Sequence, residues 1–153
     1  MTQAFSKDLY TNKAIGEGHI TILGQHYSGI IQGTWIAGVD ASQFLYGYFY
    51  NNSNAQNDQI DFKVYLATGT YTFSLLLVKS ATAAIATILL DGVSLGTIDM
   101  YAAVNTYNQI GSISNLTVTS AGLKTLSVKA ATRNGSSAGW TLAISSMSLF
   151  RTA

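Results

Sequence analysis

The chain has 153 residues, of which 48% are hydrophobic and 10% are charged, and its net charge is +1. This length fits one domain with a full core, and the hydrophobic content argues against disorder. The absence of cysteine excludes disulfides and thiolate chemistry, and the absence of a basic stripe argues against a nucleic-acid partner.

Short β-like runs separated by glycine or polar turns follow one another along the chain. Residues 1–17 are weakly patterned and predict an N-terminal arm or peripheral strand, whereas residues 18–153 predict the folded domain. The expected strands are residues 19–23, 27–35, 44–50, 58–66, 69–79, 84–90, 93–100, 110–118, 123–131 and 140–150. Their number and spacing predict an all-β fold, a single jelly-roll β-sandwich of about 8–10 antiparallel strands.

Residues 58–100 carry the strongest strand signals. From Ile60 to Leu66 the even-numbered positions are apolar, and from Tyr71 to Leu77 the odd-numbered positions are apolar, so each run has one inward face. Asp91-Gly92 lies between two such runs and predicts a two-residue hairpin turn. Two connections are less regular: residues 80–86 are expected to run from a loop into a strand, and residues 99–109 have room for one helical turn.

Residues suited to catalysis are few and scattered. His19 and His26 are expected to be ordinary surface or hydrogen-bonded histidines, and the sequence has no nucleophile elbow, zinc-binding helix or phosphate-binding loop. A hydrolase would need one of these histidines to meet two acids in a cleft. The sequence therefore predicts that the protein is not an enzyme and has no catalytic residues.

No cofactor is expected, although a structural calcium ion has possible ligands. Calcium is bound by carboxylate and carbonyl oxygens, and Asp58 beside Asn57, or Asp99 near the following loop, could supply them. These acids are isolated, without an Asp-x-Asp cluster. The longest apolar runs are too short to span a bilayer, so no membrane partner is expected.

A row of aromatic residues supplies the main candidate for a binding surface. Phe44, Tyr46, Tyr48 and Tyr50 share one face of the expected strand at a period of two, and Trp140 is a further candidate. The row could pack inside this domain's own sandwich, could form an interface with a neighbouring subunit, or could stack against sugar rings. The sequence leaves these three interpretations open.

Two sets of motifs carry a resemblance to known families, over residues 44–153. The phrases Asp-Gln-Ile-Asp-Phe-Lys-Val-Tyr-Leu-Ala-Thr-Gly-Thr-Tyr-Thr-Phe, from Asp58, and Leu-Leu-Asp-Gly-Val-Ser-Leu-Gly-Thr-Ile-Asp-Met-Tyr resemble the strand motifs of carbohydrate-binding-module-like jelly rolls. The segments from Tyr107, from Gly122, from Ala130 to Trp140 and from Leu149 to the end are similar to β-sandwich domains of bacteriophage virion proteins of the head decoration or fibre type. The second resemblance implies a virion subunit that forms a trimer, and neither transfers a binding site.

The main functional hypothesis from the sequence is therefore a non-enzymatic virion structural protein, located in the virion as a capsid decoration or fibre-like component. It would act as a homo-oligomer, favoured as a trimer, in contact with the phage capsid or another virion protein. The low charge agrees with buried interfaces, and sheet edges without lysine or proline would be hidden by association. The alternative is a carbohydrate-binding module with a glycan partner, either free or as a phage host-adhesion domain.

Overall fold

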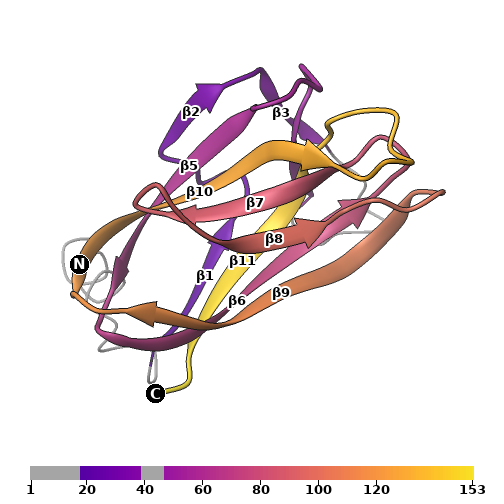
Figure 1. The fold of residues 1–153 in the computed structure, drawn as a ribbon. Coiled ribbons are helices and arrows are strands. Elements are labelled where there is room, and N and C mark those ends of the chain that lie inside the picture. Colours follow the sequence, from indigo (N-terminus) through magenta and orange to yellow (C-terminus); the bar gives the residue numbers. More distant parts are fainter. Residues whose placement is uncertain (1–17, 39–46) are drawn as a thin grey trace.

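The computed structural model describes residues 18–38 and 47–153, and the statements that follow concern these residues. Eleven strands form two antiparallel sheets that pack face to face as a sandwich (Figure 1). The strands are β1 (His19–Leu23), β2 (Gly29–Gln32), β3 (Trp35–Gly38), β4 (Tyr48–Asn51), β5 (Gln59–Leu66), β6 (Gly69–Lys79), β7 (Ala84–Leu90), β8 (Val93–Asp99), β9 (Thr106–Val118), β10 (Gly122–Arg133) and β11 (Ala143–Arg151).

Each sheet interleaves strands that are distant in the sequence. The first sheet has the order β3-β4-β11-β6-β9, and β1 pairs with β11 beside this path. The second has the order β2-β5-β10-β7-β8. The C-terminal strand β11 therefore lies at the centre of the first sheet, where it joins β4 to β6. This all-β sandwich confirms the predicted fold class.

The core lies between the two sheets and is built from the faces that the alternation predicts. Ile60, Phe62, Val64 and Leu66 of β5 are buried, as are Tyr71, Phe73, Leu75 and Leu77 of β6. The hydroxyl of buried Tyr71 also has a hydrogen-bond partner, because it donates to the carbonyl oxygen of Ala67 at 3.0 Å. The predicted inward faces are confirmed.

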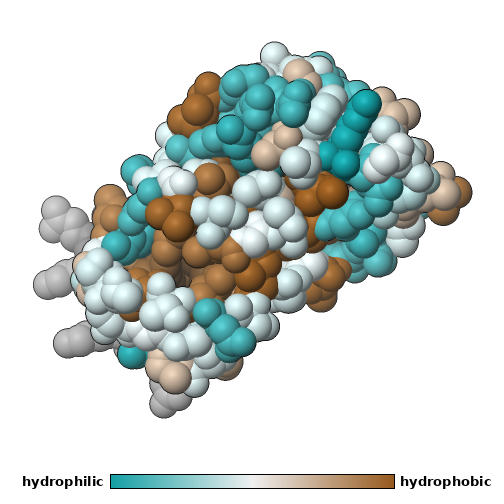
Figure 2. All heavy atoms as spheres, in the orientation of Figure 1, coloured by the Kyte–Doolittle hydropathy of each residue, from teal (hydrophilic) through white to brown (hydrophobic). Residues whose placement is uncertain are grey.

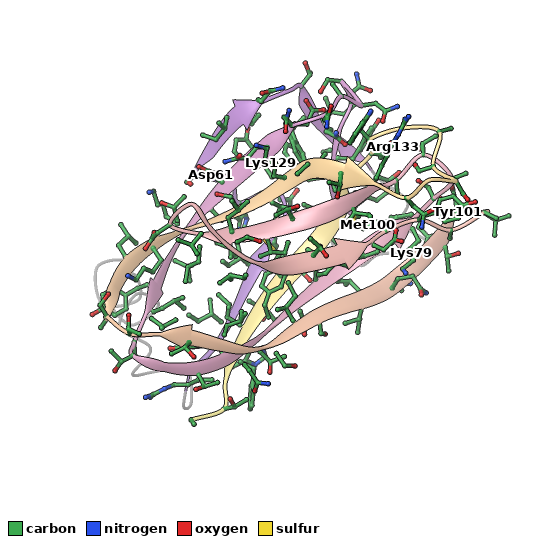
Figure 3. All side chains as sticks on the ribbon, in the orientation of Figure 1. Asp61, Lys79, Met100, Tyr101, Lys129 and Arg133 are labelled. Carbon is green, nitrogen blue, oxygen red and sulfur yellow. The ribbon has the colours of Figure 1, made fainter. Side chains whose placement is uncertain are left out.

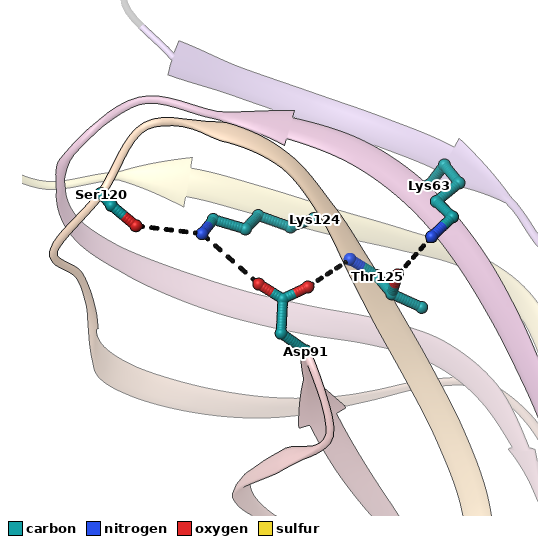
Figure 4. A network of polar contacts seen from close by, with 5 residues as sticks. All are labelled: Lys63, Asp91, Ser120, Lys124 and Thr125. Atoms are coloured by element: carbon teal, nitrogen blue, oxygen red, sulfur yellow. Dashed lines mark hydrogen bonds and ion pairs between the residues drawn. The ribbon is translucent and has the colours of Figure 1, made fainter.

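The predicted hairpin turn joins β7 to β8. Asp91 and Gly92 both have positive φ, 48° and 81°, as a two-residue type I′ turn requires. The Asp91 carboxylate accepts a hydrogen bond from the backbone N–H of Thr125 at 2.8 Å and lies 3.4 Å from Nζ of Lys124, which also donates to Ser120 (Figure 4). The N–H of Thr125, with the charge of Lys124, lowers the pKa of Asp91. The turn is thus attached to β10.

Three segments differ from the expectation. The strand expected at 27–35 is divided at Gly33, whose φ of +89° turns the chain from β2 in one sheet to β3 in the other. Residues 100–105 contain no helical turn, since Tyr101 instead forms a bridge with Ser80. β9 begins at Thr106, earlier than expected, because it pairs with β6 along nearly its whole length.

The open side of the sandwich lies between the edge strands β8 and β9. These strands are not hydrogen-bonded to each other, but glycines let them approach: Gly96 lies against Ile113, and Gly111 lies against Ile98. Apolar side chains gather in the hollowed area between these two strands in Figure 2. Side-chain contacts rather than backbone pairing therefore join β8 to β9.

Candidate functional site

Two tyrosines of the predicted aromatic row lie on the outer face of the first sheet. Phe49 points into the core with 7% exposure, so its neighbours Tyr48 and Tyr50 point outward, and both are half-buried. Their ring centroids are 5.7 Å apart at an interplanar angle of 41°. Phe44 and Tyr46, the other members of the row, lie outside the described residues.

Small residues on the neighbouring strands make room for these rings. Tyr48 is opposite Gly38 of β3, and a Cβ atom added to Gly38 would overlap the Tyr48 ring. Tyr50 is opposite Ala143 of β11. A large side chain at either position would displace the ring beside it, so the register of β3, β4 and β11 sets the positions of the tyrosines.

A third tyrosine and an apolar floor complete a hollow on this face. Val78 and Ala143 are buried beneath partly buried Tyr48, Tyr50, Leu76 and Tyr107, as a small cluster separate from the main core. The hollow, here called the tyrosine hollow, has a volume of about 180 Å³. Its lining residues are Tyr48, Tyr50, Val78, Ser80, Thr82, Asn105, Tyr107, Thr141 and Ala143. All of them are uncharged.

Three connections supply the polar wall of the tyrosine hollow. Ser80 and Thr82 come from the β6–β7 connection, Asn105 from the β8–β9 connection and Thr141 from the β10–β11 connection. Figure 3 shows Lys79, Tyr101 and Arg133, which border these connections, at one end of the sandwich. The hydroxyl oxygens of Ser80 and Thr82 are 3.3 Å apart, and those of Thr82 and Thr141 are 3.1 Å apart.

Trp140 lies beside the tyrosine hollow without lining it. Its indole packs partly against the main core, and the guanidinium of Arg133 lies 5.0 Å from the ring centroid. Its backbone N–H donates to Oδ1 of Asn54 at 2.5 Å. The structure therefore brings Tyr48 and Tyr50 together and gives Trp140 a different environment.

The two acids considered as calcium ligands are engaged by protein donors. Asp58 is buried, and its Oδ2 accepts hydrogen bonds from Asn51, Ser53 and the backbone N–H of Ala55. Asp99 accepts from the backbone N–H of Tyr101 and from Asn134. The described residues contain no group of three or more His, Cys, Asp or Glu side chains that could hold a metal ion, and the structural calcium ion stays a prediction.

His19 and His26 are both exposed. His19 lies edge-on to Phe150, with ring centroids 5.9 Å apart, and its Nε2 is 3.5 Å from the Thr21 hydroxyl. Neither histidine lines the tyrosine hollow. In the described part of the chain no helix is long and apolar enough to cross a membrane.

Local sequence reasoning missed the residues that form the rest of the tyrosine hollow. Ser80, Thr82, Asn105 and Thr141 lie in three connections that look like ordinary loops, and Tyr107 lies near the start of a strand. No spacing links them along the chain. They meet because β6, β9 and β11 are neighbours in the first sheet.

Comparison with known proteins shows solved structures with a similar β-sandwich fold. No protein-family model matches the chain, and no curated protein matches it. Among solved structures it is similar to Paenibacillus xanthan lyase, with a TM-score of 0.73 and 22% identity over 86% of this chain. The chain spans only 13% of that enzyme's length.

Two other similar structures are separate modules. One is the CBM36-1 domain of a multidomain xylanase from the hindgut metagenome of Trinervitermes trinervoides, with a TM-score of 0.62, 18% identity, and coverage of 89% of this chain and 99% of the module. The other is the carbohydrate-binding module CBM36 in complex with calcium and xylotriose, with a TM-score of 0.63, 15% identity, and coverage of 84% and 98%.

These similarities define the fold as a carbohydrate-binding-module-type β-sandwich, and they agree with that part of the resemblance seen in the sequence. None of the three structures named is a virion protein, so the virion resemblance receives no support from them. The virion location, the capsid partner and the trimer stay predictions.

Proposed function

We propose that this protein is a non-catalytic carbohydrate-binding module whose tyrosine hollow binds a neutral glycan. The observation that carries the proposal is the composition of the hollow: three tyrosines and a wall of hydroxyl and amide groups around an apolar floor. This function is the alternative that the sequence left open, and the fold of the similar binding modules supports it.

The chemistry of the lining suits a sugar ring. A pyranose has an apolar C–H face, which packs against aromatic rings, and hydroxyl edges, which exchange hydrogen bonds with Ser, Thr and Asn side chains. The lining has no charged residue, which favours neutral glycans over uronic-acid polymers. It also lacks an acid or a histidine to act as general acid or base, in keeping with binding without cleavage.

Binding to soluble polysaccharides tests the proposal. Affinity electrophoresis with xylan, glucomannan and mixed-linkage β-glucan, followed by calorimetry with oligosaccharides of the retarding polymer, should show binding by the unmodified protein. Tyr50→Ala should weaken it by about tenfold or more, because a lost aromatic contact of about 1.4 kcal/mol corresponds to tenfold in Kd.

The matched control is Tyr65→Ala. Tyr65 is also half-buried, but it lies on β5 in the second sheet and does not line the tyrosine hollow. The Tyr65→Ala variant should bind the glycan with the affinity of the unmodified protein. Equal affinities for both variants would place the glycan elsewhere, and absence of binding to every polymer would contradict the proposed function.

A further inference from the structure

The hydroxyl groups in the wall of the tyrosine hollow are oriented by Asn54, a residue of the β4–β5 connection that does not line the hollow. Oδ1 of Asn54 lies 2.5 Å from the backbone nitrogen of Trp140 and 3.2 Å from Oγ1 of Thr141. The Trp140 nitrogen can only donate, so the Asn54 atom facing it must be the amide oxygen. Because this oxygen cannot donate, the Thr141 hydroxyl gives its one hydrogen to Asn54.

This first bond sets the direction of the other two. Thr141 has no second hydrogen, so the contact with Thr82 at 3.1 Å requires Thr82 to donate to Thr141. Thr82 in turn has no hydrogen left for Ser80, so Ser80 donates across the 3.3 Å contact. All three hydroxyl hydrogens point along the row toward Asn54, and only oxygen lone pairs remain for a ligand.

Two further features favour this position of Asn54, an exposed residue of the β4–β5 connection. Its φ is +47°, a left-handed conformation that Asn adopts more readily than most residues. A Cβ atom added to Gly139 would lie 2.8 Å from Oδ1 and 2.9 Å from Nδ2 of Asn54, so the backbone of Gly139 packs directly on the amide. The backbone of Gly139 therefore covers one side of the Asn54 amide, and the two hydrogen bonds to Oδ1 hold its other contacts.

We infer that the Ser80–Thr82–Thr141 row is the acceptor-only part of the polar wall, and that it selects glycans with free hydroxyl groups over their O-acetylated forms. The inference rests on the proposed function, since it concerns the ligand of the tyrosine hollow. A free sugar hydroxyl donates to the row, whereas an O-acetyl group brings only acceptors and leaves lone pairs facing lone pairs. Asn54 acts through the row and is a positioning residue.

The experiment measures selectivity rather than affinity alone. Naturally O-acetylated xylan and glucomannan oligosaccharides, and the same material after alkaline deacetylation, are titrated into the full chain by calorimetry. The unmodified protein should bind the deacetylated material at least about tenfold more tightly, because an unmatched polar group is worth roughly 1.4 kcal/mol or more.

Variants at Asn54 separate orientation from structure. Asn54→Gly tolerates the positive φ and removes the amide, so the row can reverse and donate, and the ratio of the two affinities should fall to about threefold or less. Asn54→Asp keeps an acceptor oxygen for Trp140 and Thr141, and it should preserve the ratio. If Asn54→Gly does not fold by circular dichroism, Thr141→Val provides the second test, because it frees the Thr82 hydrogen for the ligand.

The outcomes distinguish failure of this inference from failure of the proposed function. Equal binding of both materials by the unmodified protein would overturn the acceptor-only wall and leave the proposed function standing. An unchanged ratio in the folded Asn54→Gly or Thr141→Val variant would also overturn it. Failure of the unmodified protein to bind either material would overturn the proposed function and this inference with it.

Discussion

At the scale of single residues, Asp58 organises the β4–β5 loop. This loop contains Asn54, which accepts a hydrogen bond from Thr141 in the wall of the tyrosine hollow. Oδ2 of Asp58 accepts three hydrogen bonds of 2.7–2.9 Å, while its Oδ1 is buried without a hydrogen-bond partner and faces the Cα side of Gly33. Asn51, one of the three donors, also donates to the carbonyl oxygen of Trp140 and accepts from the N–H of Leu142. Asp58 thereby ties the loop to the residues around Thr141.

Substitution of Asp58 should therefore destabilise the fold. Asp58→Ala leaves three donors without an acceptor, and the expected loss in the free energy of unfolding is about 3 kcal/mol, measured by urea denaturation. Asp58→Asn keeps one oxygen for these donors and should lose only about 1 kcal/mol. An equally large loss in both variants, or stabilisation of the unmodified protein by calcium, would show that the free oxygen needs a cation.

At the scale of elements, the β3–β4 pair positions the Tyr48 ring. Gly38 and Tyr48 are partners in the register, and the ring occupies the space above the Gly38 Cα. A glycine covered by a cross-strand aromatic ring exposes less backbone to water than an uncovered one. The same contact makes one wall of the tyrosine hollow dependent on a residue that does not line it.

Gly38→Ala should separate folding from binding. The added methyl group meets the far end of a tyrosine side chain, which can turn away, so the midpoint of thermal unfolding should change little. The displaced ring should weaken glycan binding by about three- to tenfold, measured by calorimetry. Gly135→Ala, at an open position in the β10–β11 connection, is the control; equal binding by both variants would contradict the role of Tyr48.

The β7–β8 turn should make the free energy of unfolding depend on pH. The N–H of Thr125 holds the folded-state pKa of Asp91 below its usual value of 3.8, so the carboxylate contributes stability above about pH 3.8. That contribution is lost as the pH falls through the lowered folded-state pKa. Asp91→Asn keeps a residue suited to the turn but removes the charge, so its urea midpoint should vary less between about pH 5 and 2. An unchanged slope would contradict this assignment.

At the scale of the whole molecule, three edge strands in the described ranges are protected by means other than lysine and proline. The edge strands β2 and β3 have four residues each, and β9 is interrupted by register shifts near Asn108 and Asn115, which both have positive φ. Short strands and bulges both discourage pairing with another copy. The argument for a trimer from unprotected edges is correspondingly weaker.

Since these edges no longer argue for the predicted trimer, we expect the glycan-binding module proposed above to be a monomer in solution. Light scattering coupled to size-exclusion chromatography should give a mass near 16.3 kDa across a wide range of protein concentration. A stable mass of three times this value would contradict the expectation and would revive the subunit assembly that the sequence favoured. Glycan binding measured on the same fractions would show whether association hides the tyrosine hollow.

The sequence by itself determined the all-β fold, the inward faces of β5 and β6, and the turn at Asp91-Gly92. These features could be predicted because alternation and turn chemistry depend on residues that are adjacent in the chain. It also predicted that Tyr48 and Tyr50 share a face, but it left open whether that face points into the sandwich.

Only the tertiary structure decided which side of the sheet those rings occupy and what surrounds them. Phe49 takes the core side of β4, and the pairing of β11 with β4 and β6 brings Thr141 and Ser80 to the same hollow as Tyr50. The hydrogen bond from Thr141 to Asn54 joins residues 87 positions apart. Such contacts depend on the order of strands in the sheet, which no local pattern in the sequence encodes.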